Sequence, residues 1–108
     1  MLPKQNRLPS PEIKFVMRVG RRVTTPELVC IWNANKTTQA RFAFIVSTKV
    51  DKRATMRHRI KRVLGESVRQ LAPNMNIGAD VLLIARSKSL SESTEKTVKI
   101  LSEILRRI

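Results

Sequence analysis

The segment from Asp80 to Arg86 (DVLLIAR) places five apolar residues in a row, and it constrains the fold more than any other stretch of the chain. A strand with one face in water alternates apolar and polar residues, whereas a strand covered on both faces is almost continuously apolar. We therefore expect a strand that is covered, or nearly covered, on both faces. The run is too short for a membrane-spanning helix, which needs about 20 apolar residues.

The N-terminal half predicts a helix followed by strands. Apolar residues at helical spacing after a capping serine predict a helix from about Pro11 to Val19, with Ser10 as N-cap and Gly20 as C-cap. Runs rich in β-branched and aromatic residues predict strands at Glu27–Trp32 and Arg41–Ser47. We expect the polar segment 33–39 between them to close a hairpin, and a short extra strand near residues 21–24 is possible on the same grounds.

The C-terminal half predicts a long helix, the apolar strand and a last helix. The long helix covers Ala54–Leu71, with Asp51 or Thr55 as its cap and Pro73 just beyond its end. The last helix begins near Ser91, and its apolar residues recur at helical spacing: Val98, Leu101, Ile104, Leu105 and Ile108. The order α-β-β-α-β-α, with room for one more strand, predicts a single α+β domain over residues 1–108.

Composition narrows the class of partner. The chain has 22 Lys and Arg against 8 Asp and Glu, a net charge of +14, while 42% hydrophobic residues leave enough for a core. Nucleic acid is the first partner class for such a polycation, and anionic lipid is the second. A single cysteine excludes a disulfide framework and a cysteine-based zinc site, and it fits a reducing, cytosolic setting. The N-terminus lacks the apolar stretch of a secretory signal.

The charge is concentrated before and along the long helix. Residues 49–62 hold seven basic side chains and one acid, a net charge of +6. On a helical projection Met56, Ile60, Val63, Leu64, Ser67, Val68 and Leu71 form one arc. The opposite arc holds His58, Arg59, Lys61, Arg62 and Arg69, with Arg57 at the border. Gly65 lies on this cationic arc, where a missing side chain would let a phosphate backbone approach.

A solvated helix face is the alternative interpretation of these charges. Such faces usually mix acids and bases at spacings of three or four residues. No acid lies between Arg57 and Arg62, and like charges this close destabilise an isolated helix. We therefore expect an anionic partner, with nucleic acid favoured.

Residues 57–64 (RHRIKRVL) resemble the Arg-Asn-Arg motif, with its Ile-Lys-Arg continuation, of the protein subunit of bacterial ribonuclease P. Four more segments resemble that family in the same order: 6–8 (NRL), 41–49 (RFAFIVSTK), 49–54 (KVDKRA) and 80–86 (DVLLIAR). The resemblance implies one α/β sandwich domain of the ribosomal-protein-S5-domain-2-like type, with a left-handed β-α-β crossover. Most such crossovers are right-handed, so composition alone could not have indicated it.

The resemblance also implies a function. The protein would be the non-catalytic subunit that binds the catalytic RNA of ribonuclease P, as a monomer in a complex of one protein and one RNA. This cytoplasmic complex hydrolyses precursor tRNA to release the 5′ leader and requires Mg²⁺, while the protein alone binds no cofactor and no metal, and has no DNA or membrane partner. Its RNA-binding residues would be Lys49, Lys52, Arg53, Arg57, His58, Arg59, Lys61, Arg62 and Arg69. A cleft between the first helix and the sheet, with Ile13, Met17, Ile31 and Ser47, would take the single-stranded leader.

Three departures from the family pattern affect these expectations. His58 stands where the family usually has Asn, which adds a possible pH dependence. Thr48 replaces a Lys near the cleft. Ile13, Met17 and Ile31 stand where many members have Phe or Tyr, and because aromatic stacking on a base is worth about 1–3 kcal/mol, we expect weaker leader contacts.

Other reactive side chains have simpler interpretations. The eight acids are scattered over different elements, so self-contained catalysis is not expected. We expect Cys30 and Trp32 in the core, although Trp32 and Phe15 could instead contribute to the leader cleft. Ser47 could bind a phosphate or its own turn. Arg41 and Arg86 are candidate phosphate contacts or solvated strand ends.

Two other functions remain open at this stage. A structural RNA-binding protein of the ribosomal type would use the same fold and charge without any processing role. A duplex-DNA binder is weaker, because no second helix lies a short turn from the basic one, as helix-turn-helix docking requires.

Overall fold

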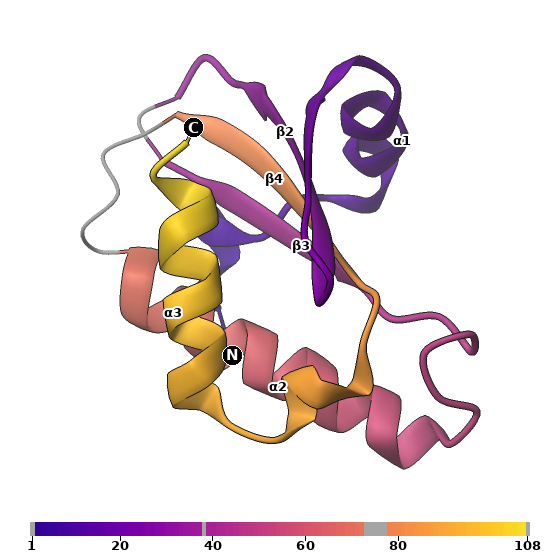
Figure 1. Cartoon of the computed structure of the whole chain (residues 1–108). Helices are drawn as coiled ribbons and strands as arrows, with labels where there is room; N and C mark the ends of the chain where they lie inside the picture. Colours follow the sequence, from indigo (N-terminus) through magenta and orange to yellow (C-terminus); the bar gives the residue numbers. More distant parts are fainter. Residues whose placement is uncertain (1, 38, 73–77, 108) are drawn as a thin grey trace.

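A computed structural model describes residues 2–37, 39–72 and 78–107. Within these residues the chain forms three α-helices and four strands, with short 3₁₀ turns at Lys4–Asn6 and Lys88–Ser91. The main elements are, in order, α1 (Ser10–Val19), β1 (Arg21–Thr24), β2 (Leu28–Ala34), β3 (Arg41–Ile45), α2 (Ala54–Leu71), β4 (Ala79–Ala85) and α3 (Thr94–Leu105) (Figure 1). The predicted α+β class, the extra strand at residues 21–24 and the bounds of the long helix are confirmed.

The apolar strand β4 lies inside the sheet, whose strand order is β1-β2-β4-β3. It pairs antiparallel with β2 and parallel with β3, and every residue from Ala79 to Leu83 is buried. The prediction of a strand covered on both faces is therefore confirmed. β3, α2 and β4 form a β-α-β unit, because β3 and β4 are parallel neighbours joined through α2.

The predicted hairpin through residues 33–39 is wrong. β2 and β3 are not neighbours, since β4 lies between them. The hairpin of this fold joins β1 to β2, with Thr24 opposite Val29 and Arg21 opposite Trp32. The physical reason is that β4 buries more apolar surface, and pairs both of its edges, when it lies between two strands.

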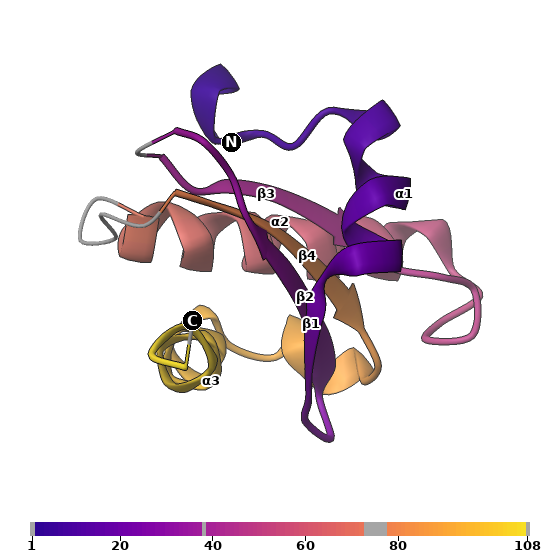
Figure 2. The same ribbon diagram turned by 90° about the horizontal axis from the view of Figure 1, so that it is seen from above.

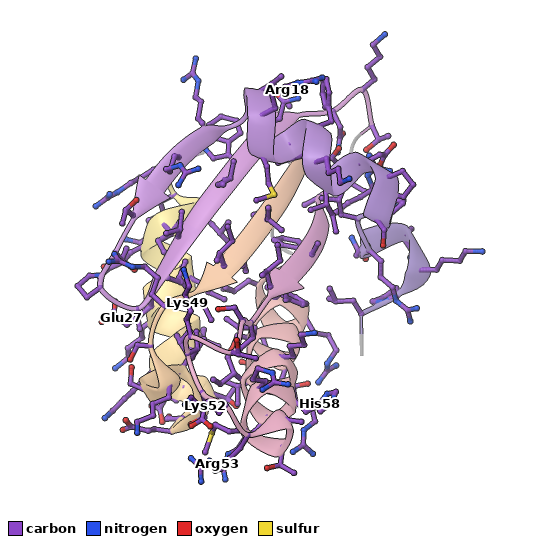
Figure 3. All side chains as sticks on the ribbon, turned by 90° about the vertical axis from the view of Figure 1, so that its right-hand side faces the viewer. Arg18, Glu27, Lys49, Lys52, Arg53 and His58 are labelled. Carbon is purple, nitrogen blue, oxygen red and sulfur yellow. The ribbon has the colours of Figure 1, made fainter. Side chains whose placement is uncertain are left out.

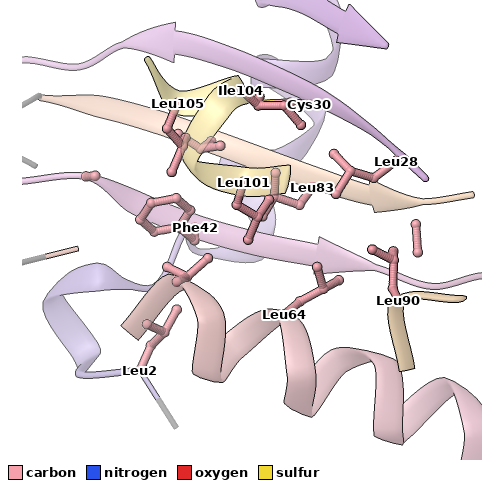
Figure 4. Packing of buried hydrophobic residues seen from close by; sticks show 14 of the residues in the cluster. Leu2, Leu28, Cys30, Phe42, Leu64, Leu83, Leu90, Leu101, Ile104 and Leu105 are labelled. Carbon is pink, nitrogen blue, oxygen red and sulfur yellow. The ribbon is translucent and has the colours of Figure 1, made fainter. Parts of the chain in front are cut away.

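α2 and α3 cover one face of the sheet and enclose the main core (Figure 4). Ile60, Leu64 and Val68 of α2 are fully buried, together with Leu101 of α3. They pack against the strand residues of that face: Leu28, Cys30, Phe42, Val81 and Leu83. Burial raises the pKa of the Cys30 thiol to about 12, so the cysteine is the core residue that the sequence predicts.

α1 lies on the other face of the sheet, on the side opposite α3 (Figure 2). Val16 of α1 is buried against Ile31 and Leu82. The sheet residues around this contact are only partly buried: Val29, Ala43, Ile45 and Ile84. α1 therefore leaves part of an apolar sheet face accessible.

The helix ends differ from the predictions in detail. α1 includes Ser10, whose side chain makes no capping bond. Arg53 precedes α2 as the N-cap, and its own N–H donates to Asp51 Oδ1 at 2.8 Å, so Asp51 organises the turn before the helix and Thr55 does not cap it. Ser91 belongs to the 3₁₀ turn, and Ser93 caps α3 by accepting the N–H of Lys96. Pro73 and Ile108 lie outside the described residues.

A charged cluster ties α1 to the sheet. Arg41 donates two hydrogen bonds to Asp80, from Nε to Oδ1 and from Nη2 to Oδ2, both at 2.8 Å. The same Nη2 lies 2.8 Å from Glu12 Oε2 on α1. Asn35 donates a further bond to Asp80 Oδ1 at 2.8 Å. The hydrogen bonds from Arg41 to Asp80 raise the pKa of the guanidinium. Because Arg41 is engaged with Asp80 and Glu12, it is not a free phosphate contact at the start of its strand.

We expect Arg41→Ala to lower the free energy of unfolding by about 2–3 kcal/mol, measured by chemical denaturation. The loss is below the ~3–5 kcal/mol of a fully buried pair, because 24% of the Arg41 side chain is exposed and Asn35 still donates to Asp80. The Asp80 side chain, 11% exposed, would nevertheless lose its counterion. Adding Asp80→Asn should recover part of the loss. Lys14→Ala, on the exposed side of α1, is the control and should stay within about 0.5 kcal/mol of the wild type. Equal stability of Arg41→Ala and Lys14→Ala would contradict the role of Arg41.

Two glycines should respond in opposite ways to alanine. A Cβ at Gly20 would lie 2.6 Å from the carbonyl oxygen of Val16 and 2.7 Å from Ile31 Cγ2, so Gly20→Ala should cost about 1–3 kcal/mol of stability. A Cβ at Gly65 would meet only the Phe44 ring, at 3.8 Å. Gly65→Ala should therefore be neutral or stabilise by up to about 1 kcal/mol through helix propensity. Urea unfolding of both variants checks the pair, and a loss at Gly65 matching that at Gly20 would refute it.

Candidate nucleic-acid interface

The outward face of α2 carries three exposed side chains of the predicted set, two of them cations. His58, Lys61 and Arg62 are exposed, at positions i, i+3 and i+4 of the helix. Within the described part of the chain, none of these side chains has a hydrogen-bond or ion-pair partner. Figure 3 shows His58 on the side of α2 away from α3. Because Ile60 and Leu64 on the opposite side of α2 are buried, these three side chains point outward.

Arg57 and Arg59 are held by the chain's own carbonyl groups. Arg57 Nη1 donates to the carbonyl oxygens of Asp51 at 3.1 Å and Lys52 at 2.8 Å. Arg59 Nε donates to the carbonyl oxygen of Ser91 at 3.2 Å. Arg57 therefore fastens the loop before α2 to the helix, and Arg59 fastens α2 to the turn before α3. Each guanidinium has five N–H donors, so both keep donors free for a ligand.

The loop before α2 adds three exposed cations. Lys49, Lys52 and Arg53 are exposed, and Figure 3 shows them along the chain leading into α2. Asp51 Oδ1 accepts a hydrogen bond from the backbone N–H of Arg53 at 2.8 Å. The Arg53 guanidinium donates two more, from Nε to Oδ1 at 3.0 Å and from Nη2 to Oδ2 at 2.9 Å. These bonds, the side-chain bond first, lower the pKa of Asp51 to about 2.

Arg69, like Arg53, is paired with a neighbouring acid. Its guanidinium is paired with Glu66 one turn earlier, with Nε 3.0 Å from Oε2 and Nη2 2.6 Å from Oε1. The hydrogen bond from Arg69 lowers the pKa of Glu66, so both groups stay charged and compensate each other. Arg69 therefore adds little net positive charge to the face.

The predicted leader cleft is brought together only in part. Ile13 is half-buried and Met17 is 44% exposed, and both lie on α1. Ile31 is 1% exposed beneath α1, which corrects its assignment as a contact residue: it belongs to the core under the cleft. Ser47 is exposed, and its Oγ accepts the N–H of Lys49 at 3.3 Å. This is the hydrogen bond within its own turn that the sequence offered as the alternative to a phosphate contact.

The sequence named Phe15 as an alternative cleft residue but did not single out Val19, and both are accessible on α1. Phe15 is 48% exposed and Val19 is 44% exposed, four residues apart on one side of α1, whereas Met17 lies on another side. Their helical spacing was visible, but no periodicity shows how much of a helix the sheet will cover. Trp32 is half-buried against the main core, as the sequence favours, and the guanidinium of Arg21 lies 5.7 Å from its ring centroid. Arg86 remains exposed at its strand end and donates to the carbonyl oxygen of Thr25 at 2.8 Å.

The described residues offer neither a metal site nor a membrane-spanning helix. Among residues 2–37, 39–72 and 78–107, no three His, Cys, Asp or Glu side chains gather in a way that could hold a metal ion. No helix in the same ranges combines the length and the apolar character needed to cross a membrane.

The fold and this surface define a small α/β protein with a polycationic helix face. The family model described as Ribonuclease P matches residues 2–108. The ribonuclease P protein component of Rippkaea orientalis is 33% identical over 96% of this chain and 87% of its own length. That of Xanthomonas campestris is 36% identical over 85% of this chain, which spans 61% of that relative. The RNase P protein from Thermotoga maritima shares the fold, with a TM-score of 0.83 at 23% identity, covering 94% of this chain and 96% of that one.

The chain therefore belongs to the ribonuclease P protein family, and its role is that of a protein component of ribonuclease P. The resemblance in residues 57–64 is confirmed at the level of the family and the fold. The individual RNA contacts remain predictions.

Acid titration of the loop before α2 tests its geometry. Because the pKa of Asp51 is lowered from 3.8 to about 2, this carboxylate should stay ionised in the folded protein where an ordinary aspartate has become neutral. Its contribution to stability is complete above about pH 4 and is lost as the pH falls through 2. Side-chain NMR should give the low titration midpoint in the wild type, and Arg53→Ala should move the midpoint back towards 3.8. An unchanged midpoint in this variant would contradict the pairing.

Proposed function

We propose that this chain binds the catalytic RNA of ribonuclease P through the outward face of α2 and the loop before it. The observation that supports this most directly is the trio His58, Lys61 and Arg62, exposed on one face without an acid between them. Lys49 and Lys52 extend the same charge along the loop, where Arg53 is paired with Asp51. A phosphate backbone following the helix and the loop would meet cations from both segments, and phosphate contacts supply much of the affinity of such complexes.

The proposal gives the leader of precursor tRNA a second surface, formed by α1 and the open part of the sheet. Met17 is exposed on α1, and Ile13, Ile45 and Ile84 are partly buried around the contact of α1 with the sheet. Unpaired bases can stack or pack on such side chains, whereas the stacked bases of a duplex cannot.

The chemistry in this proposal belongs to the RNA. The protein would act as a monomer in a complex of one protein and one RNA, located in the cytoplasm, that removes the 5′ leader hydrolytically and requires Mg²⁺. The protein's part is to hold both RNAs, with no metal of its own and no membrane or DNA partner. This is what membership in the family leads us to expect for the finer details of its role.

Reconstitution tests the function as a whole. The full-length chain is added to a ribonuclease P RNA transcript at low Mg²⁺, and removal of the leader from precursor tRNA is measured. We expect faster cleavage and a lower Mg²⁺ requirement than with the RNA alone. Binding without any stimulation would instead favour a structural RNA-binding protein of the ribosomal type.

The pair Lys61 and Arg62 offers a sharper variant than Arg57 or Arg59, because neither side chain holds the fold together through a hydrogen bond in the described part of the chain. We expect the double variant Lys61→Ala, Arg62→Ala to bind the transcript more weakly. The slope of log K against log salt should fall by about 1.4–1.8, since each neutralised phosphate contributes about 0.7–0.9.

A charge-matched control is Lys96→Ala with Lys99→Ala on α3, which removes two exposed cations outside this face. Its affinity and salt slope should stay close to those of the wild type. If both double variants lose affinity equally, net charge rather than the α2 face is responsible for binding.

A further inference from the structure

A cavity of about 770 Å³ lies between the N-terminal segment, β3 and the outward face of α2. The cavity and the open sheet face beside α1 lie on opposite faces of β3. Phe42 and Phe44 line the cavity, whereas Ala43 and Ile45 lie on the α1 side. Its volume is within the ~300–1,000 Å³ of small-molecule sites.

The wall formed by the N-terminal segment is fixed by hydrogen bonds. The N–H of Leu8 donates to the carbonyl oxygen of Phe42 at 2.8 Å, and Arg7 forms a parallel bridge with Phe42. Asn6 Nδ2 donates to the carbonyl oxygen of Ala40 at 2.8 Å. Arg7 Nε reaches back to the carbonyl oxygen of Leu2, also at 2.8 Å. These bonds hold residues 2–8 beside β3 as one side of the cavity.

Gly65 keeps the opposite wall open. It lies on the face of α2 that lines the cavity, and an added Cβ would touch only the Phe44 ring, at 3.8 Å. A larger side chain at this position would project into the cavity. The aromatic ring of Phe44 is half-buried, so one part of it is accessible from the cavity, while Phe42 and Leu8 form a buried floor.

The rim of the cavity is cationic. Arg7, His58, Lys61 and Arg62 line it. Its one acid is Glu66, whose two carboxylate oxygens are bound to Arg69 at 3.0 Å and 2.6 Å, so its charge is compensated. An apolar, partly aromatic floor beneath a positive rim suits a ligand that joins a flat ring to an anion.

We propose that this cavity takes the base of one unpaired nucleotide of the RNA that α2 binds, with the base against Phe44 and its phosphate at Lys61 and Arg62. The proposal rests on the proposed function and makes it more specific. A duplex cannot enter, because its bases are stacked inside the helix, whereas an unpaired base can be splayed out onto an aromatic ring. The α2 face thereby recognises a local RNA structure, in addition to neutralising phosphates.

Gly65→Leu tests the cavity without removing any charge, and leucine favours a helix over glycine, so folding is preserved. We expect its affinity for a ribonuclease P RNA transcript to fall about 5- to 150-fold, the equivalent of about 1–3 kcal/mol for one stacked base. The salt slope should stay unchanged because all cations remain. Phe44→Leu, which keeps apolar volume but removes the ring, should change affinity in the same direction.

Gln70→Leu is the matched control, because it adds the same side chain at an exposed position of α2 outside the cavity. Base-specific chemical probing gives the second readout. One unpaired base of the transcript should be protected by the wild type and by Gln70→Leu, and should become reactive with Gly65→Leu.

Several results would overturn the proposal. Wild-type affinity in Gly65→Leu, or the absence of any base whose protection depends on Gly65, would overturn the cavity while leaving the α2 face in place. Self-association of the free protein that Gly65→Leu abolishes would assign the cavity to a second copy of the chain. A wild-type chain that does not bind the transcript would overturn the proposed function as well.

Discussion

The exclusion of water from both faces of β4 is the constraint on which the rest of the structure depends. The strand pairs with β2 and β3 on its two edges, and its side chains enter the main core on one face and the contact with α1 on the other. Burying the apolar arc of α2 on this sheet leaves the opposite arc no position except in solvent. The cationic face of α2 is thus a direct result of how β4 is covered.

The arginines of the helix motif act in two different ways. Arg57 and Arg59 bond to carbonyl oxygens at the loop before α2 and at the turn before α3, whereas Arg62 points outward without a protein partner in the described residues. A loop held in place loses less conformational entropy when it binds RNA than a free loop would. The two internally bonded arginines therefore prepare the surface that Arg62 and its exposed neighbours present.

The elements that were predicted correctly are those with strong local patterns. The 3.6-residue period of residues 54–71 gave the exact bounds of α2, and the apolar run at residues 80–86 indicated a strand covered on both faces. Strand partners are not a local property, so the antiparallel pairing of β2 with β4 replaced the expected hairpin. The burial of Ile31 and the cavity beside Phe44 depend on how α1 and the N-terminal segment pack from a distance, and no local period contains that information.

The position of Cys30 has a practical consequence for spectroscopy on this protein. Its thiol is fully buried and carries a pKa of about 12, so almost none of it is thiolate at neutral pH. Alkylating dyes and spin labels react with the thiolate form. In the folded protein, a label would therefore react with a cysteine introduced on the exposed side of α1 or in the loop before α2, and not with Cys30. Distances from such a label to a bound RNA could be measured without first replacing Cys30.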